Sequence, residues 1–207
     1  MDYVHPVQAV IPGAQGRVLA VLAQTTAALN LSTLARLAGV SVAQASRLMP
    51  GLVALGVVER REIPPSSQFR LVRENVAAQA IIDLARSRDI ALDRIGAAVA
   101  ALPFQPVSVI VFGSFARGEA DEHGDLDAII VRPDDVDEDD DTWATAIEQW
   151  RSEAQAITGN RIEILEVARH EVRTKLAGRA SLWRDVVRDG VVIHGLTIEQ
   201  LMKHVHA

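Results

Sequence analysis

Two aspartates one residue apart, Asp125 and Asp127, are the strongest chemical signal in the sequence. They begin an apolar run, Leu126 to Val131, that predicts a buried strand. Residues two apart on a strand point to the same face, so both carboxylates should project together while Leu126 turns into the core. Carboxylates that lie so close together raise each other's pKa unless a cation lies between them. The pair therefore predicts a site for Mg²⁺, which proteins commonly hold with one or two carboxylates and substrate phosphates.

A glycine and a serine ahead of these acids are candidates for binding the phosphates. The apolar run Val107 to Phe112 predicts a strand that breaks at Gly113-Ser114, with ten residues between this turn and Asp125. If a helix begins at the turn, its backbone N–H groups and the Ser114 hydroxyl can meet phosphate oxygens. The alternative is a plain hairpin that carries two solvated aspartates.

The strand, the Gly-Ser turn, the ten-residue spacer and the paired aspartates together resemble the signature of the nucleotidyltransferase superfamily typified by DNA polymerase β. Within that superfamily the sequence most resembles the minimal nucleotidyltransferases, whose motif often reads G-S-x-A-R-G-x-A before S-D-x-D. The matching residues are Gly113, Ser114, Ala116, Arg117, Gly118, Ala120, Asp125 and Asp127. The sequence departs at Gly124, where the family often has serine.

The resemblance implies roles for the matching residues. Gly113, Ser114 and Arg117 would bind the triphosphate tail of a nucleotide. Asp125 and Asp127 would be catalytic and would hold two Mg²⁺ ions that bridge the attacking and leaving oxygens.

A third acid is common on a later strand in this superfamily, and the predicted strand from Arg161 to Val167 offers two candidates. Glu163 lies between two isoleucines and should point away from the core, so we assign it as the third catalytic and metal-binding carboxylate. Glu166, three residues later, is the alternative. The sequence alone leaves this choice open.

Composition limits the class of protein. The 207-residue chain contains no cysteine, which excludes disulfides and thiolate metal sites and suits a reducing cytosol. Its N-terminus lacks the basic and apolar regions of a signal peptide. No stretch approaches the roughly 20 apolar residues that span a bilayer. We therefore expect a cytoplasmic protein that has no membrane partner.

The net charge of −6 is unevenly distributed along the chain. Up to Arg73, seven arginines stand against three acids, a balance of +4, so the remainder carries −10. This asymmetry indicates separate roles for the two halves, with the basic half the candidate for binding nucleic acid. The acidic run from Asp134 to Asp141 lacks the spacing of a calcium loop, and we expect it to be a solvated connection.

The basic half has the pattern of a winged helix. Ser32 and Ser41 can each cap a helix and Gly39 can end the first one, as in a helix-turn-helix. The expected helices span 32–38 and 41–55, and the expected wing strands span 57–63 and 68–72. Over residues 15–73 the sequence resembles the winged-helix domains of bacterial transcription regulators.

That second resemblance implies double-stranded DNA as a partner. Helical spacing places Gln44, Ser46 and Arg47 on the exposed side of the second helix, where base edges and phosphates would be met. Arg60 and Arg61 on the wing can contact phosphates. The alternative is a winged helix that makes protein contacts only.

The sequence therefore predicts a two-domain α/β (α+β) protein. A winged helix-turn-helix domain (1–73) and a helical linker (74–102) would precede a minimal nucleotidyltransferase domain (103–207), whose mixed sheet is flanked by helices. The histidine pair at 204 and 206 has the spacing of a weak metal pair at a chain end.

The resemblances imply Mg²⁺-dependent transfer of a nucleoside monophosphate from a nucleoside triphosphate to a protein or nucleic acid acceptor. The short second half leaves no room for a separate acceptor domain, so a partner protein, the other subunit of a homodimer or the N-terminal half would bind the acceptor. The winged helix would let the protein regulate its own operon. The alternative is a DNA-binding regulator whose nucleotidyltransferase-like domain senses nucleotide or mediates assembly without catalysis.

Overall fold

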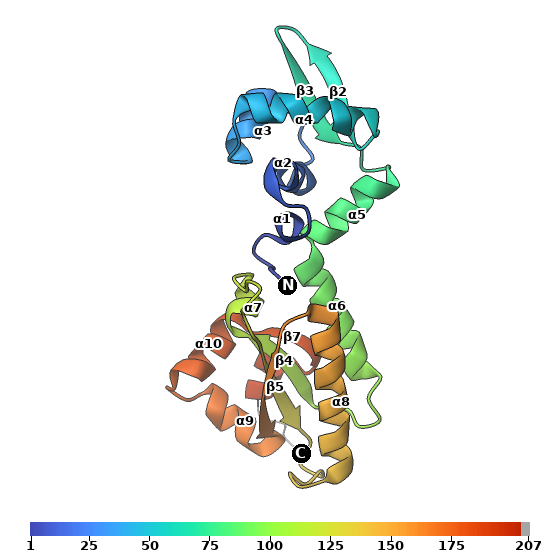
Figure 1. Ribbon diagram of the computed structural model, residues 1–207. Coiled ribbons are helices and arrows are strands. Elements are labelled where there is room, and N and C mark those ends of the chain that lie inside the picture. Colours follow the sequence, from blue (N-terminus) through green and yellow to red (C-terminus); the bar gives the residue numbers. More distant parts are fainter. Residues whose placement is uncertain (204–207) are drawn as a thin grey trace. The chain divides into compact units, whose positions relative to one another are not determined.

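The computed structural model describes residues 1–203, which leaves the expected pair His204 and His206 outside the described residues. Its contacts divide the chain into two compact units (Figure 1). One unit spans His5–Ser87, and the other combines Met1–Val4 with the residues that follow Ser87. The division therefore falls inside the segment expected as a linker, and it separates the first four residues from the winged helix. Within the described residues, no helix is both long and apolar enough to cross a membrane.

The first unit is a helix-turn-helix with a small sheet. Its helices are α1 (Pro6–Val10), α2 (Gly13–Gln24), α3 (Leu31–Leu37), α4 (Val42–Ala54) and α5 (Val76–Ala85). Its antiparallel sheet, in the order β1-β3-β2, contains β1 (Leu29–Asn30), β2 (Val58–Ile63) and β3 (Ser66–Leu71). One apolar core joins these elements and includes Leu19, Leu22, Leu34, Met49, Leu52, Phe69 and Ile82.

Side-chain caps explain where the two helices of the helix-turn-helix begin. Ser41 caps α4 as expected, in a reciprocal capping box with Gln44. The cap of α3 is Asn30 and not the expected Ser32, because the Asn30 side chain accepts a backbone N–H of the first turn at 2.8 Å. The helix α3 therefore begins at Leu31, one residue before the expected cap.

The wing is a tighter hairpin than expected. Pro64 and Pro65 form its turn, and Ile63 pairs with Ser66 directly across it. The strand β3 consequently begins two residues earlier than predicted. Serine is common in loops, so the sequence favoured a loop at Ser66 and Ser67. In the structure both residues pair with β2 instead.

The second unit is built on a mixed sheet of four strands in the order β6-β5-β4-β7. The strands are β4 (Ser108–Phe112), β5 (Leu126–Arg132), β6 (Ile162–Ala168) and β7 (Val191–Gly195). The strands β5 and β6 run parallel, whereas β4 is antiparallel to both of its neighbours. The helices are α6 (Ser87–Ala100), α7 (Gly113–Arg117), α8 (Asp141–Thr158), α9 (Arg169–Leu176), α10 (Ser181–Asp189) and α11 (Ile198–Met202).

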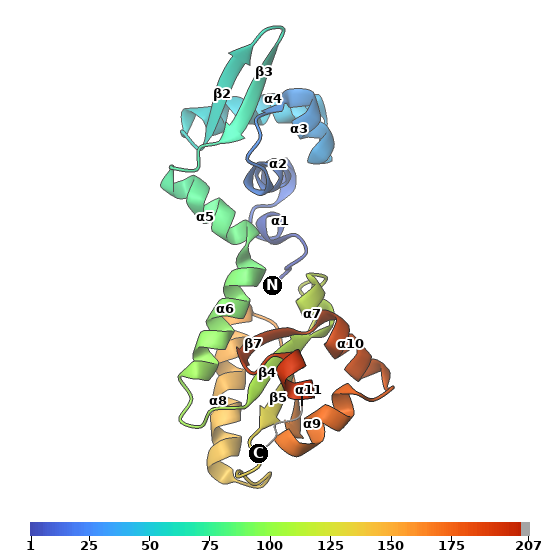
Figure 2. The same cartoon turned by 180° about the vertical axis from the view of Figure 1, so that it is seen from behind.

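Helices cover both faces of this sheet (Figure 2). On one face α6 and α8 enclose a core that buries Trp143 and Trp150. On the other face α9, α10 and α11 pack over Ile110 and Ile129. A strand covered on both sides is apolar almost throughout, which is why β5 appeared in the sequence as a continuous apolar run. The predicted two-domain α/β architecture is confirmed.

The acidic run before α8 is exposed, but two of its carboxylates have structural partners. Asp140 caps α8 by accepting two backbone N–H groups. Asp134 accepts the backbone N–H of His170 at 2.9 Å and lies 2.7 Å from its Nδ1. The run is therefore a connection that also begins α8 and fixes the start of α9.

Candidate functional site

The three candidate carboxylates lie where the adjacent strands β5 and β6 begin. Asp125 directly precedes β5, and Asp127 is the second residue of that strand. The parallel register of β5 and β6 pairs Asp127 with Glu163. Burial raises the pKa of the Asp127 carboxyl, and the negative charges of Asp125 and Glu163 raise this pKa further. The three acids therefore repel one another, and a cation among them would relieve that repulsion.

The two glutamates of β6 have different surroundings. Glu166 accepts hydrogen bonds from Arg132 Nε at 2.6 Å and from Trp143 Nε1 at 3.0 Å. Its charge is compensated, and its contacts join β5, β6 and α8. Glu163 pairs with the exposed Arg161, and 46% of its own side chain is exposed. Glu163 thus lies beside Asp127 with a partly exposed carboxylate, whereas Glu166 serves the contacts among β5, β6 and α8.

The Gly-Ser turn lies directly beside these acids. The last residue of β4, Phe112, is the register partner of Asp127, and α7 begins at the next residue, Gly113. Gly113 has a φ of +72°, and a Cβ added to it would lie 2.4 Å from Asp127 Oδ2, so a larger residue would displace the carboxylate. Ser114 follows in the first turn of α7 and is partly exposed. The fold thus places the Gly-Ser turn beside the paired aspartates of the predicted signature.

Arg117, the remaining member of the expected phosphate-binding set, already has acidic partners. Its Nε donates to Glu119 at 2.7 Å, and its Nη1 lies 3.6 Å from an oxygen of Asp189 on α10. The charge of Arg117 also opposes the rise that burial causes in the pKa of Asp127, so this guanidinium acts on the candidate site. A bound triphosphate would compete with Glu119 and Asp189 for it.

The donor set is compatible with Mg²⁺ but is incomplete by itself. Within residues 1–203, no group of three histidine, aspartate or glutamate side chains is arranged to hold a metal ion. Asp125 and Asp127 offer carboxylate oxygens, and burial, followed by the negative charges of Asp125 and Glu163, raises the pKa of Asp127. Mg²⁺ keeps several waters and is usually bound by one or two carboxylates with substrate phosphates. A site that the nucleotide completes fits this ion.

Asn160 is a buried residue that has no signal of function in the sequence, where it is only half of a Gly-Asn turn. Its Nδ2 donates to the carbonyl oxygens of Asp121 at 3.1 Å and Gly124 at 2.7 Å. The Met1 nitrogen donates to its Oδ1 at 2.9 Å. Asn160 thereby holds the loop that leads to Asp125. Its partners lie 36 to 159 residues away along the chain, so no local pattern could reveal them.

The predicted DNA contacts on α4 are exposed, but they are not equivalent. Ser46 and Arg47 face solvent, and Arg47 Nε donates to the carbonyl oxygen of Ala43 at 3.2 Å. Gln44 is also exposed, yet its Oε1 accepts the Ser41 N–H at 2.9 Å in the capping box. Gln44 therefore stabilises the start of the helix, and its side-chain oxygen is already engaged.

The two wing arginines, Arg60 and Arg61, also differ. Arg60 Nη2 lies 2.6 Å from an oxygen of Glu62, and Arg60 Nε donates to the Ser67 hydroxyl at 3.1 Å. The exposed Arg61 side chain forms no ion pair or hydrogen bond within the part of the chain that the structure describes. Arg61 is consequently the better-placed cation for a phosphate, because no carboxylate of the described residues contacts it. Its acidic neighbour Glu59, whose pKa is lowered first by the hydrogen bond from Arg70 and further by the charge of Arg61, is already paired with Arg70.

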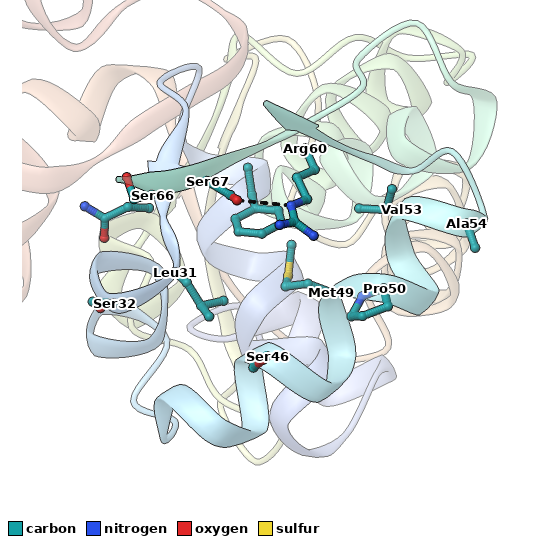
Figure 3. Close-up of a pocket in the computed structure, with 12 residues that line it drawn as sticks. Leu31, Ser32, Ser46, Met49, Pro50, Val53, Ala54, Arg60, Ser66 and Ser67 are labelled. Carbon is teal, nitrogen blue, oxygen red and sulfur yellow. Dashed lines mark hydrogen bonds between the residues drawn. The ribbon is translucent and has the colours of Figure 1, made fainter. Parts of the chain in front are cut away.

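A cavity of about 750 Å³ separates α4 from the wing and the start of α3 (Figure 3). Ser46 on α4 and Arg60 on the wing both line it, so two of the predicted contacts face the same hollow. Met49 and Phe69, which are buried core residues, form part of its apolar wall. The sequence did not indicate this cavity, because residues that line a hollow have the same helical spacing as residues that fill a core.

Comparison with known proteins finds one matching family model within each unit. Residues 98–193 match the family model described as a nucleotidyltransferase domain, and this range includes the Gly-Ser turn and all three candidate acids. Residues 16–62 match the model described as an IclR helix-turn-helix domain, and this range includes α3 and α4. No curated protein matches the chain.

Five chains of solved structures match. One of them is described as the crystal structure of a toxin-antitoxin with AMP-PNP. It is 13% identical to this chain, and the match covers 54% of this chain and 80% of that one with a TM-score of 0.38. A likeness at this level carries no structural argument about the present site.

Proposed function

We propose that this chain transfers a nucleoside monophosphate from a nucleoside triphosphate to a hydroxyl group of a protein or nucleic acid acceptor. In the chain a nucleotidyltransferase domain of the polymerase β type follows an IclR-type helix-turn-helix domain. The observation that carries this proposal is the contact between the Gly-Ser turn and Asp127. Glu163 lies beside the same aspartate on the neighbouring strand. A phosphate-binding turn and a cluster of carboxylates are the two parts that the reaction needs.

In the proposed reaction, the acceptor oxygen attacks the α-phosphorus of the nucleotide. A new P–O bond forms while the bond from the α-phosphorus to the oxygen that bridges to the β-phosphate breaks, and pyrophosphate leaves with that electron pair. Glu163, the most exposed of the three acids, would help to accept the hydroxyl proton. Two Mg²⁺ ions held by Asp125, Asp127 and Glu163 would supply the charge that stabilises the attacking and leaving oxygens.

The remaining site residues would bind the triphosphate tail. Gly113 lets the backbone of the turn approach Asp127, and Ser114 offers a hydroxyl and an N–H at the start of α7. Arg117 would exchange Glu119 and Asp189 for phosphate oxygens when the nucleotide binds. The chain itself would therefore supply positive groups to the tail and negative groups to the metals.

A labelling assay tests this activity directly. Purified protein is incubated with Mg²⁺, each of the radiolabelled triphosphates and a cell extract as the source of acceptor. We expect a labelled macromolecule that depends on Mg²⁺ and is lost in the Asp125→Asn variant. If no product forms, and Asp125→Asn does not weaken Mg²⁺-dependent binding of triphosphate, the enzymatic proposal is wrong.

We propose a second role for the winged-helix unit, which would bind double-stranded DNA near the protein's own promoter. The exposed Arg47 and Arg61 side chains and the IclR-type match support this role. A homodimer would bind a palindrome, because the symmetry of the site follows that of the protein. Footprinting on the promoter region should reveal a preferred site, and uniform protection along the fragment would contradict the proposal.

One observation favours the alternative of a regulator without catalysis. Arg117 is held by two acids, Glu119 and Asp189, and is not free to bind a triphosphate until they release it. A domain of that kind would bind nucleotide and change DNA affinity without releasing pyrophosphate. Measuring pyrophosphate release and DNA affinity in the same nucleotide titration separates the two roles.

A further inference from the structure

The short helix α7 is held by two residues outside the predicted signature, Tyr3 and Arg88. Both belong to the second unit, and both lie where the chain passes between the units. Tyr3 lies two residues before His5, the first residue of the winged-helix unit, and Arg88 directly follows Ser87, its last residue. The two segments that connect the winged helix to the rest of the chain therefore each contribute one residue that contacts the same helix.

Arg88 binds the carboxyl end of α7. Its Nε donates to the carbonyl oxygen of Phe115 at 2.8 Å, and its Nη2 donates to that of Ala116. The last carbonyls of a helix lack partners within the helix, and a cation there complements the helix dipole. The Phe115 carbonyl also accepts the Gly118 N–H at 3.1 Å, so Arg88 adds a second donor to it. The planar guanidinium can bridge two such oxygens, whereas an ammonium group offers a single point charge. Arg88 thus fixes both the position and the direction of α7.

Tyr3 holds the buried side of the same helix. Its ring meets that of Phe115 edge-on, with the ring centroids 4.7 Å apart. Its N–H donates to the carbonyl oxygen of Ala120 at 2.9 Å, and its hydroxyl donates to that of Thr158 at 2.8 Å. Tyr3 therefore joins α7, the loop after it and the end of α8 in a single contact region.

A helix of five residues depends on such contacts, because one turn is unstable by itself. The residues that Arg88 and Tyr3 hold, Phe115 and Ala116, directly follow Gly113 and Ser114 in that turn. Any movement of α7 would shift the turn relative to Asp127, because the Asp127 carboxylate lies directly against Gly113. The placement of the turn thus depends on two side chains outside the signature.

We propose that Arg88 and Tyr3 are positioning residues of the nucleotide site. They hold α7 so that the Gly-Ser turn faces Asp127, and they connect this helix to both segments that lead into the winged-helix unit. The expected effect on KM rests on the proposed nucleotidyltransferase function, whereas the position of α7 can be measured without turnover.

The kinetic test uses Arg88→Ala with MgATP as the probe and the labelling assay as the readout. We expect the KM for MgATP to rise at least about tenfold while kcat changes much less, because a displaced turn binds the triphosphate poorly. Free guanidinium ion should restore the low KM, since the Arg88 side chain is 25% exposed and its site can be refilled. Arg94→Ala is the matched control, because Arg94 is an exposed arginine of the same helix α6.

Amide hydrogen exchange tests the positioning independently of activity. In Arg88→Ala and in Tyr3→Leu, the amides of residues 113–118 should exchange faster than in Arg94→Ala, while the strands of the sheet keep their protection. If the wild type uses none of the triphosphates in the labelling assay, the proposed function fails, and this exchange pattern alone decides the inference. Unchanged exchange at 113–118, or faster exchange throughout the unit with no rescue by guanidinium, would overturn it.

Discussion

The carboxylate of Asp127 occupies the space that a side chain at Gly113 would need. A Cβ added to Gly113 would lie 2.4 Å from Asp127 Oδ2, far closer than van der Waals contact. Gly113 also has a φ of +72°, a conformation that side chains disfavour. The glycine at the start of the turn is therefore required by its own backbone and by the carboxylate it accommodates.

Gly113→Ala should consequently be damaging in two separable ways. Left-handed strain should cost about 1–2 kcal/mol of stability, and displacement of Asp127 should lower Mg²⁺-dependent turnover by about 100-fold or more. Gly39→Ala is the matched control, because Gly39 has a φ of +60° and no atom lies within 4 Å of an added Cβ. Chemical denaturation and the labelling assay measure the two effects. Equal losses of activity in both variants would show that strain, and not the contact with Asp127, matters.

The two glutamates of β6 should respond in opposite ways to the same substitution. Glu163→Gln removes a charge beside Asp127, so turnover should fall at least about tenfold with little change in stability. Glu166→Gln leaves Arg132 without its carboxylate, so it should cost about 1–3 kcal/mol of stability while turnover stays nearly normal. Turnover and urea unfolding of both variants check this expectation. The reverse pattern would identify Glu166 as the third acid.

Tyr3 provides a pH-dependent test of the contacts around α7. Burial raises the pKa of its phenol above the ordinary value of 10.0. The neutral form is favoured by folding, so this contribution to stability is complete below pH 10.0 and is lost as the pH rises through the folded-state pKa. Tyr3 is the only tyrosine of the chain, so tyrosinate absorbance follows this residue alone. Titration at the pKa of free tyrosine would show that the phenol is not buried, and Tyr3→Phe supplies the blank.

The wing arginines should differ in their contribution to DNA binding. Arg61→Ala should weaken binding to duplex DNA and reduce the magnitude of the salt slope by about 1, because one phosphate contact is lost. Arg60→Ala should have a smaller effect, since Glu62 already compensates Arg60. Fluorescence anisotropy with a labelled duplex at several salt concentrations measures both. Identical slopes for the wild type and Arg61→Ala would exclude this arginine from the DNA interface.

Features that depend on neighbouring residues were predictable from the sequence. The strand, turn and second strand around Gly113 and Asp127 follow from apolar runs interrupted by a glycine, and the structure has each of them. The cap of α4 at Ser41 follows in the same way, because a capping box involves residues only three apart. The two-domain architecture was predictable because each half has its own local pattern.

Only the tertiary structure decided which of these residues meet. The register of β5 on β6 places Glu163 beside Asp127, and a period of two residues along a single strand carries no information about that register. Asp189, which lies near Arg117, and the partners of Arg88 come from segments that are distant in sequence. Long-range contacts of this kind depend on how packed elements fit together. The sequence therefore determined which carboxylates, hydroxyls and cations the chain contains, and packing determined which of them lie close enough to act together.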